Sequence, residues 1–412
     1  MKNFYDPIQC ASDDLFERAD LAKTILERIR EKDCLNTIGL YGGWGTGKSS
    51  VLNLMAEYVK RSKRFHIETI DTWKYESTGN ILAPLVTRLS KSLGVDRENH
   101  ARHILQVALL FLSDVALRKT AGIDLGDVMS FRDEAEKASN ITKHWTQLVD
   151  EIEKTNEEFF LLVEEFLKKR KKKHLIVCVD NLDRCAPENA LRFLDSVKNL
   201  MLVNNCTWVF AIDNEVIASY VSKKYGEADI DGHAFLDKVV NEQFHIPAIG
   251  NFELQELLWN RFELDVDLKF ELDKINYLLT PRILMKVGKK YKEFLVKDPL
   301  ASKLTPLTKQ IAFSMIVLYF LRPDFYKYLS SCAKEQLSGV LANFYGNSTI
   351  QPTAKKSPIP EKFKDTDLEF FMKVCFVESI DRPTVYIGSL TNELVEDLLG
   401  DLFLRLNAIG LP

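Results

Sequence analysis

The first half of the chain alternates between short apolar runs and longer segments with apolar residues at helical spacing. Leu35–Tyr41 predicts a strand, Gly42–Gly47 the turn after it, and Ser49–Lys60 a helix. The same patterns predict further strands at Phe65–Asp71, at His174–Val179 with Asp180 at its end, at Thr207–Ile212 and at Gln243–Ile246. Further helices are predicted at Asp13–Lys32, with Asp13 or Asp14 as its cap, at Ile81–Leu93 and at Pro187–Leu202. Strands that alternate with helices form a parallel sheet covered on both faces, so we expect an α/β fold.

The rest of the chain is predominantly helical. No strand signal occurs from about Arg97 to Lys172, and after Pro247 the helical pattern continues to about Ala342. The stretch from Gly346 to Asp365 is rich in Pro, Ser, Thr and Lys, as linkers are. We therefore expect a core at residues 1–250 with a helical insert at about 97–172, a helical domain at 251–345, and a linker with a small C-terminal module at 346–412.

Composition narrows the class of protein. The 412 residues are 46% hydrophobic and 28% charged, and the net charge of −4 argues against general attraction to nucleic acid or an anionic membrane. The basic run Lys168–Lys173 is either a solvated helix end, which we favour, or a contact for nucleic acid or lipid headgroups. The apolar segments Ile104–Leu117 and Ile311–Leu321 are shorter than the ~20 residues of a spanning helix, so we expect buried helices and no transmembrane span.

The seven cysteines include no C-x-x-C pair, and the first residues carry acids instead of the apolar centre of a secretory signal. We therefore expect reduced thiols in a cytoplasmic protein, with neither a disulfide framework nor a zinc site. The histidines show no metal-ligand spacing.

The turn after the first strand carries a phosphate-binding pattern. Residues 42–49 read GGWGTGKS, which fits G-x-x-x-x-G-K-[ST] between a strand and a helix. Glycines let successive main-chain N–H groups point at one anion, and the following helix adds its positive N-terminal end. Lys48 is expected to reach the β- and γ-phosphates, and Ser49 to hold magnesium. The residues expected to bind the nucleotide are Gly42, Gly43, Trp44, Gly45, Thr46, Gly47, Lys48, Ser49 and Ser50.

A phosphate loop of this kind works with an acid at the end of a neighbouring buried strand. Asp180 supplies it, and its carboxylate is expected to accept a magnesium-bound water beside Ser49. No N-K-x-D string, which guanine recognition in GTPases requires, occurs in the chain. We therefore expect ATP as the nucleotide and Mg²⁺ as the metal.

The residue that orients the attacking water is less defined. In many ATPases an acid directly follows the magnesium aspartate, but here that place is Asn181, which cannot take a proton. Asp183 is the first candidate, with a structural role such as pairing Arg184 as an equal alternative; Glu68 and Asp71 are further candidates. This gap predicts hydrolysis that is slow or is completed by a partner.

The motifs and their order resemble the KAP family of P-loop NTPases over roughly Pro7–Leu329. The shared strings are GGWGTGKSS in the loop, DTWKYE at Asp71–Glu76, VDNLDRC at Val179–Cys185, FAIDNEVI at Phe210–Ile217, FLDKVV at Phe235–Val240, TPRILMKV at Thr280–Val287 and RPDFYKYL at Arg322–Leu329. The resemblance implies an ATPase fold with an additional strand between the loop strand and the Asp180 strand. The family often carries transmembrane helices between the loop and the Asp180 motif, but this insert is charged, which favours a soluble member.

The resemblance also implies roles for two residues beyond the loop. Arg282 looks like the arginine that related ATPases place from a helical lid, here 251–345, against the γ-phosphate, which would couple nucleotide state to lid movement. The alternative is an arginine that caps a helix near Pro281. Asp213, at a strand end, either reads the nucleotide or holds the attacking water, or it serves a turn.

Two functions from different classes follow. The first is an ATPase whose nucleotide cycle moves the lid and changes its contacts with partner proteins, which are expected to be products of a bacterial phage-defence operon. The second is a nucleotide-stabilised scaffold with little intrinsic hydrolysis. Assembly into an oligomer is compatible with both, whereas no helicase motif or broad basic stripe supports a DNA motor.

Overall fold

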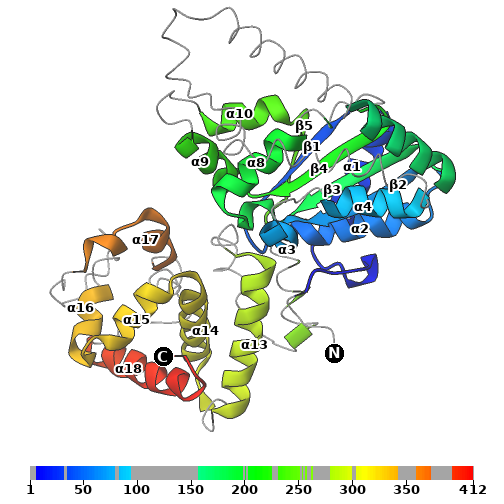
Figure 1. Ribbon diagram of the computed structural model, residues 1–412. Helices are drawn as coiled ribbons and strands as arrows, with labels where there is room; N and C mark the ends of the chain where they lie inside the picture. Colours follow the sequence, from blue (N-terminus) through cyan, green and yellow to red (C-terminus); the bar gives the residue numbers. More distant parts are fainter. Residues whose placement is uncertain are drawn as a thin grey trace, which may run out of the picture. The chain divides into compact units, whose positions relative to one another are not determined.

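The computed structural model describes residues 6–31, 35–78, 83–93, 156–197, 200, 203–224, 231–250, 253, 256–257, 261–262, 279–298, 303–341, 359–372 and 392–411 (Figure 1). Most of the predicted insert at 97–172, the apolar segment Ile104–Leu117 and most of the linker at 346–365 lie outside the described residues. The chain divides into two compact units, Pro7–Ile246 and Met1–Asp6 with Pro247–Pro412. The three-part division inferred from the sequence stays a prediction.

The first unit is built on a five-stranded parallel sheet. The strands are β1 (Thr37–Tyr41), β2 (Phe65–Asp71), β3 (His174–Asp180), β4 (Cys206–Ile212) and β5 (Glu242–His245). They lie in the order β2-β3-β4-β1-β5, and each neighbouring pair is parallel. The predicted α/β fold is therefore confirmed, and β4 is the additional strand expected between β1 and β3.

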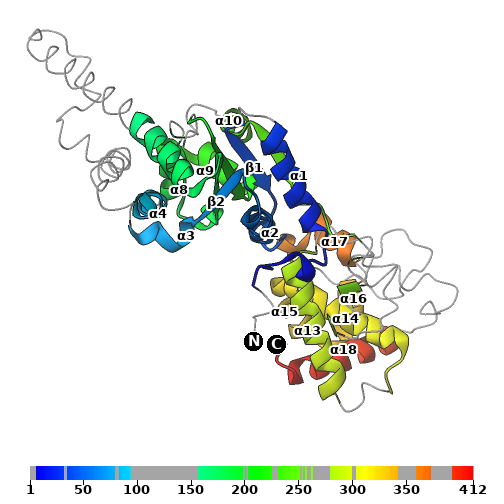
Figure 2. The same cartoon turned by 90° about the vertical axis from the view of Figure 1, so that its right-hand side faces the viewer.

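Helices cover both faces of this sheet, as Figures 1 and 2 show. One face packs against α1 (Arg18–Glu31) and α2 (Lys48–Lys60). The other face packs against α4 (Ala83–Leu93), a helix at residues 156–170, α8 (Pro187–Val197), α9 (Asn214–Lys224) and α10 (Gly232–Val239). All residues of β3 and β4 are buried, as expected for central strands of a parallel sheet covered on both sides. This buried centre fixes where the strand ends lie.

The start of the first helix differs from the sequence prediction. Helix α1 begins at Arg18 instead of Asp13, because the Asp14 carboxylate accepts hydrogen bonds from the main-chain N–H groups of Phe16, at 3.2 Å, and Ala19, at 2.7 Å. Asp14 thereby holds a turn that precedes the helix and caps its first residues. The described part of helix α8 runs from Pro187 to Val197, and most of the predicted remainder up to Leu202 lies outside the described residues.

The second unit is helical in its described part. Its longer helices are α13 (Pro281–Lys297), α14 (Pro306–Leu321), α15 (Pro323–Ser331) and α18 (Asn392–Ala408); α16 (Leu337–Leu341) and α17 (Thr366–Met372) are shorter. Proline occupies the first turn of α13, α14 and α15, where its missing N–H costs no hydrogen bond. Thr280 and Thr305 cap α13 and α14 with their side chains. The apolar segment Ile311–Leu321 forms the C-terminal part of α14, as predicted; it is buried through Leu318, and its last three residues are half-buried.

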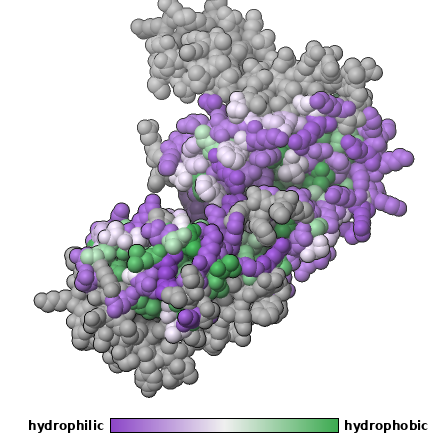
Figure 3. Space-filling model, turned by 90° about the horizontal axis from the view of Figure 1, so that it is seen from below, coloured by the Kyte–Doolittle hydropathy of each residue, from purple (hydrophilic) through white to green (hydrophobic). Residues whose placement is uncertain are grey.

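The surface of the described residues is mixed in character. Figure 3 shows hydrophilic residues with smaller apolar areas between them. Within the described ranges, no helix combines the length and the apolar character needed to cross a membrane.

The contact between α9 and α10 offers a test of the packing. A Cβ atom at Gly232 would lie 2.1 Å from the main-chain oxygen of Ala218, so the two helices touch through their backbones. We expect Gly232→Ala to lower the free energy of unfolding by about 1–3 kcal/mol, because the helices must move apart. Urea denaturation measures the change. The neighbouring exposed substitution His233→Ala is the control and is expected to cost less than about 0.5 kcal/mol; equal effects would contradict the close packing.

Candidate functional site

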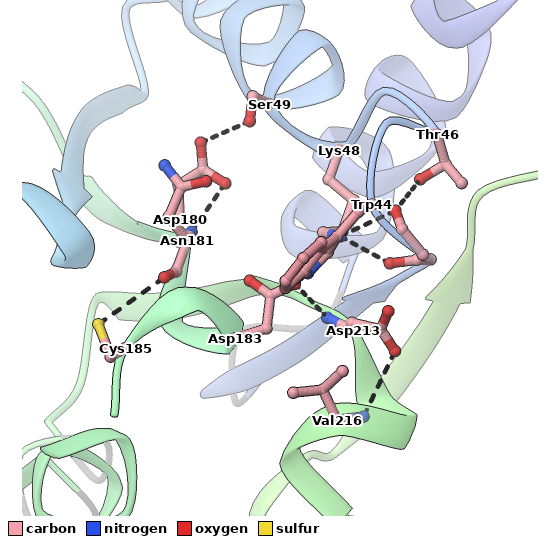
Figure 4. Close-up of polar contacts among 12 residues, drawn as sticks. Trp44, Thr46, Lys48, Ser49, Asp180, Asn181, Asp183, Cys185, Asp213 and Val216 are labelled. Carbon is pink, nitrogen blue, oxygen red and sulfur yellow. Dashed lines mark hydrogen bonds and ion pairs between the residues drawn. The ribbon is translucent and has the colours of Figure 1, made fainter. Parts of the chain in front are cut away.

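The loop from Gly42 to Gly47 leaves β1 and leads into α2, and Figure 4 shows Trp44 and Thr46 of this loop together with Lys48 and Ser49 at the start of the helix. Gly47 has φ 109°, a conformation that disfavours every residue with a side chain. A Cβ atom at Gly42 would lie 2.8 Å from Thr46 Oγ1 and 3.1 Å from the Ile246 side chain. Thr46 closes the loop by donating from Oγ1 to the Gly43 oxygen at 2.9 Å. The loop therefore curls tightly in front of the N-terminus of α2, as an anion cradle requires.

Lys48 is the first residue of α2, and its side chain folds over the loop. Its Nζ donates to the main-chain oxygens of Gly42 at 2.6 Å and Gly43 at 3.1 Å, and lies 3.5 Å from Asp183 Oδ2. Burial lowers the pKa of Lys48, and the carboxylates of Asp183, Asp213 and Asp180 oppose that shift. The site thus holds a buried ammonium group at the mouth of the phosphate loop.

Ser49 and Asp180 meet beside this ammonium group. Ser49 Oγ donates to Asp180 Oδ2 at 2.6 Å, across 131 residues of sequence. Asp180 ends β3 and is 8% exposed. Burial raises its pKa, while hydrogen bonds from Ser49 and from the Asn181 main chain act in the opposite direction. A buried carboxylate and a hydroxyl at contact distance are oxygen ligands of the kind that Mg²⁺ prefers.

The protein oxygens at this point suit a metal shared with a substrate. Among the residues that the structure describes, no cluster of three or more His, Cys, Asp and Glu side chains could hold a metal ion by itself. Magnesium typically takes one or two protein ligands and completes its octahedron with phosphate oxygens and waters. Ser49 and Asp180 fit that role.

Asp183 lies in the short 3₁₀ turn Leu182–Arg184 and is only 2% exposed. Its Oδ2 accepts hydrogen bonds from Trp44 Nε1 at 2.9 Å and from the Asp213 main-chain N–H at 3.2 Å, next to Lys48 (Figure 4). Arg184, the partner considered from the sequence, instead lies with its guanidinium 5.5 Å from the centre of the Trp73 ring. Asp183 therefore ties the phosphate loop to the turns after β3 and β4.

Two further residues of the site have local partners. The Asp213 carboxylate accepts from the main-chain N–H of Val216 at 3.5 Å, at the start of α9. The Ser50 hydroxyl accepts from the main-chain N–H of Ile8 at 3.3 Å, which holds the N-terminal segment against α2. Contacts of Ser50 and Asp213 with a nucleotide stay predictions.

Hydrogen bonds join the segment after β2 to the end of β3 and to the segment that follows β3. The strand ends are in register, with Asp71 opposite Asp180. Thr72 Oγ1 donates to the main-chain oxygen of Asp180 at 2.8 Å, and Glu76 Oε1 accepts from the Ala186 main-chain N–H at 2.6 Å. These joins were not foreseen from the sequence, because the strand order that brings β2 beside β3 was not predicted.

Arg282 occupies the second position of α13, in the other compact unit. The cap of this helix is the Thr280 side chain, whose Oγ1 accepts from the Ile283 main-chain N–H at 3.3 Å. Capping is therefore not what requires an arginine here. A nucleotide-sensing role for Arg282 stays a prediction.

Comparison with protein families matches residues 18–312 to the KAP family P-loop domain. The match contains the loop, Ser49, Asp180, Asp183, Asp213 and Arg282, and it covers more than half of the chain. No curated protein matches the chain.

Asp183→Ala tests the network that holds the loop. We expect it to lower the free energy of unfolding by about 2–4 kcal/mol, because two donors lose their acceptor and buried Lys48 loses a charge partner. Denaturant unfolding gives the value. Asp195→Ala is the matched control, since Asp195 pairs with Lys224 at a partly exposed position on α8. A loss for Asp183→Ala no larger than for the control would contradict the network.

Proposed function

Because the chain belongs to the KAP family of P-loop NTPases, we propose that its Gly42–Ser49 loop binds ATP with Mg²⁺ and that the chain hydrolyses this nucleotide slowly. Membership makes the chain a nucleotide-binding NTPase. The choice of ATP follows from the sequence, which has no N-K-x-D string for guanine.

The observation that carries the proposal is the 2.6 Å contact between Ser49 Oγ and Asp180 Oδ2. It joins the N-terminus of α2 to the end of β3, at the side of the loop where Lys48 lies. A carboxylate this buried is costly unless a positive partner compensates it, and a divalent cation is such a partner. When bound there, Mg²⁺ would neutralise charge on the nucleotide's phosphate oxygens.

The chain's own groups supply the rest of the phosphate site. Main-chain N–H groups of the loop would donate to the phosphates, and the N-terminus of α2 would add its partial positive charge. Lys48, which now donates to main-chain oxygens of the loop, would exchange them for the stronger charge-assisted bond to phosphate. Asp183 would act by positioning Lys48 and Trp44 instead of touching the nucleotide.

The biological role that we propose reaches further than the site. Arg282 would contact the γ-phosphate and couple nucleotide state to movement of the helical domain. This movement would change contacts with partner proteins in bacterial phage defence, a context that rests on the family resemblance alone. A second candidate, a nucleotide-stabilised scaffold with little turnover, is favoured by Asn181, which stands where many ATPases have an acid.

Phosphate release from Mg·ATP tests the proposal. We expect measurable turnover that falls at least about 100-fold in Lys48→Ala and in Asp180→Ala, because Lys48 supplies a positive charge to the phosphates and Asp180 would hold the metal that neutralises them. Lys23→Ala, which changes an exposed lysine paired with Asp20, is the control and is expected to match the wild type. Mg·ATP binding without any turnover would favour the scaffold; no binding of Mg·ATP or Mg·GTP would refute both candidates.

Ser49→Ala separates metal binding from nucleotide binding. We expect the magnesium concentration for half-maximal turnover to rise about tenfold or more, because the variant loses one of two protein oxygens near the metal. Binding of ATP in the presence of a chelator is expected to change little, since the loop amides and Lys48 remain. Magnesium titration of the variant at saturating ATP gives the result. An unchanged magnesium requirement would contradict the site.

A further inference from the structure

The edge of the sheet at the phosphate loop carries a second carboxylate that the site so far does not use. Asp71 ends β2 and lies opposite Asp180 in the register of β2 and β3. The two strand ends are held together by Thr72, which donates to the Asp180 main-chain oxygen at 2.8 Å. Asp71 is therefore fixed beside the residue proposed to hold the metal.

The Asp71 side chain is oriented by a hydrogen bond from Asn181, the residue that directly follows β3. Asp71 precedes α3 (Thr72–Tyr75) as its N-cap, yet its carboxylate makes no capping hydrogen bond. Its Oδ1 instead accepts from Asn181 Nδ2 at 3.0 Å, across 110 residues of sequence. Within the part of the chain that the structure describes, no donor contacts its other oxygen, Oδ2.

Asn181 bridges two carboxylates. Its main-chain N–H donates to Asp180 Oδ1 at 3.0 Å while its side-chain amide donates to Asp71. The residue has φ 63°, a left-handed conformation that asparagine adopts more readily than most residues. The side chain that occupies the place of the missing acid thus orients an acid on the adjacent strand.

Two other candidate acids, Asp183 and Glu68, are engaged elsewhere. Asp183 Oδ2 already holds Trp44, the Asp213 main chain and Lys48, and the residue is 2% exposed. Glu68 lies three residues before the end of β2 and contacts His66 at 3.0 Å and Arg88 at 3.6 Å. Among these acids, Asp71 combines a strand-end position with an oxygen open to a water molecule.

We propose that Asp71 is the catalytic residue that activates the attacking water, and that Asn181 is the residue that positions it. The inference rests on the proposed hydrolysis of Mg·ATP. The water oxygen forms a bond to the γ-phosphorus, and the bond from that phosphorus to the β–γ bridging oxygen breaks. ADP leaves with the electron pair of that bond, and the proton of the water passes to the Asp71 carboxylate and then to solvent. No oxidant, reductant or further reactant is needed.

Moving the acid from position 71 to position 181 by substitution tests this assignment. We expect Asp71→Asn to lower kcat for Mg·ATP about 100-fold or more, the usual contribution of general base catalysis, with the Kd for Mg·ATP within about threefold of wild type. The introduced amide still offers a carbonyl oxygen to Asn181, so the fold is expected to persist. Asp71→Asn combined with Asn181→Asp returns an acid to the edge, directly after Asp180, and is expected to recover at least about tenfold of the loss. Asp195→Asn on α8 controls for the change of residue type.

Phosphate release and calorimetric binding of Mg·ATP are measured for all four proteins. Wild-type turnover in Asp71→Asn overturns the assignment and leaves the proposed function intact. A loss that added magnesium restores also overturns it, because Asp71 would then be a metal ligand. If the double variant recovers nothing while binding Mg·ATP normally, the exchange fails and the assignment is rejected. A wild-type chain that binds Mg·ATP without releasing phosphate likewise rejects it, whereas a wild-type chain that binds no nucleotide refutes the proposed function itself.

Discussion

The meeting of Ser49 and Asp180 depends on one constraint, the parallel alignment of β1 and β3 on either side of β4. Parallel strands end at the same edge of a sheet, so the loop after β1 and the carboxylate at the end of β3 come together there. The side chains of β3 and β4 are buried against helices on both faces of the sheet, and this packing keeps β3 and β4 in register. Ser49 then reaches Asp180 at 2.6 Å because α2 begins directly behind the loop. A shift of either strand would separate them.

The electrostatics of this edge explain why it is suited to a charged ligand. Burial acts against the charge of both Lys48 and Asp180, lowering the pKa of the first and raising that of the second. Main-chain oxygens of the loop and the Asp183 carboxylate satisfy the ammonium group in part. A phosphate for Lys48 and a metal for Asp180 would satisfy both more fully. The buried charges of Lys48 and Asp180 are therefore those that a metal–nucleotide complex would use.

The sequence predicted the α/β fold, the five strands and the phosphate loop, because each has a local signal: an apolar run, a helical period or a glycine pattern. Asp180 could be found because it ends an apolar run that reads HLIVCV. The links from Asp183 to Trp44 and from Asn181 to Asp71 could not, since each joins side chains more than 100 residues apart. These links depend on the order of the strands and on the left-handed backbone at Asn181. The spacing of residues along the sequence predicts neither feature. Helix α1 begins late because the Asp14 side chain accepts main-chain hydrogen bonds in a turn before the helix. The spacing of apolar residues does not reveal such a contact.

A crystal structure of the chain with Mg²⁺ and a non-hydrolysable ATP analogue tests the central claim most directly. The account predicts phosphates within the Gly42–Gly47 loop and Lys48 Nζ moved from the main-chain oxygens of Gly42 and Gly43 to a phosphate oxygen. It also predicts a metal about 2.0–2.1 Å from Ser49 Oγ, on the side of Asp180. A nucleotide bound elsewhere, with Lys48 still on those oxygens and Ser49 still donating to Asp180, would contradict it.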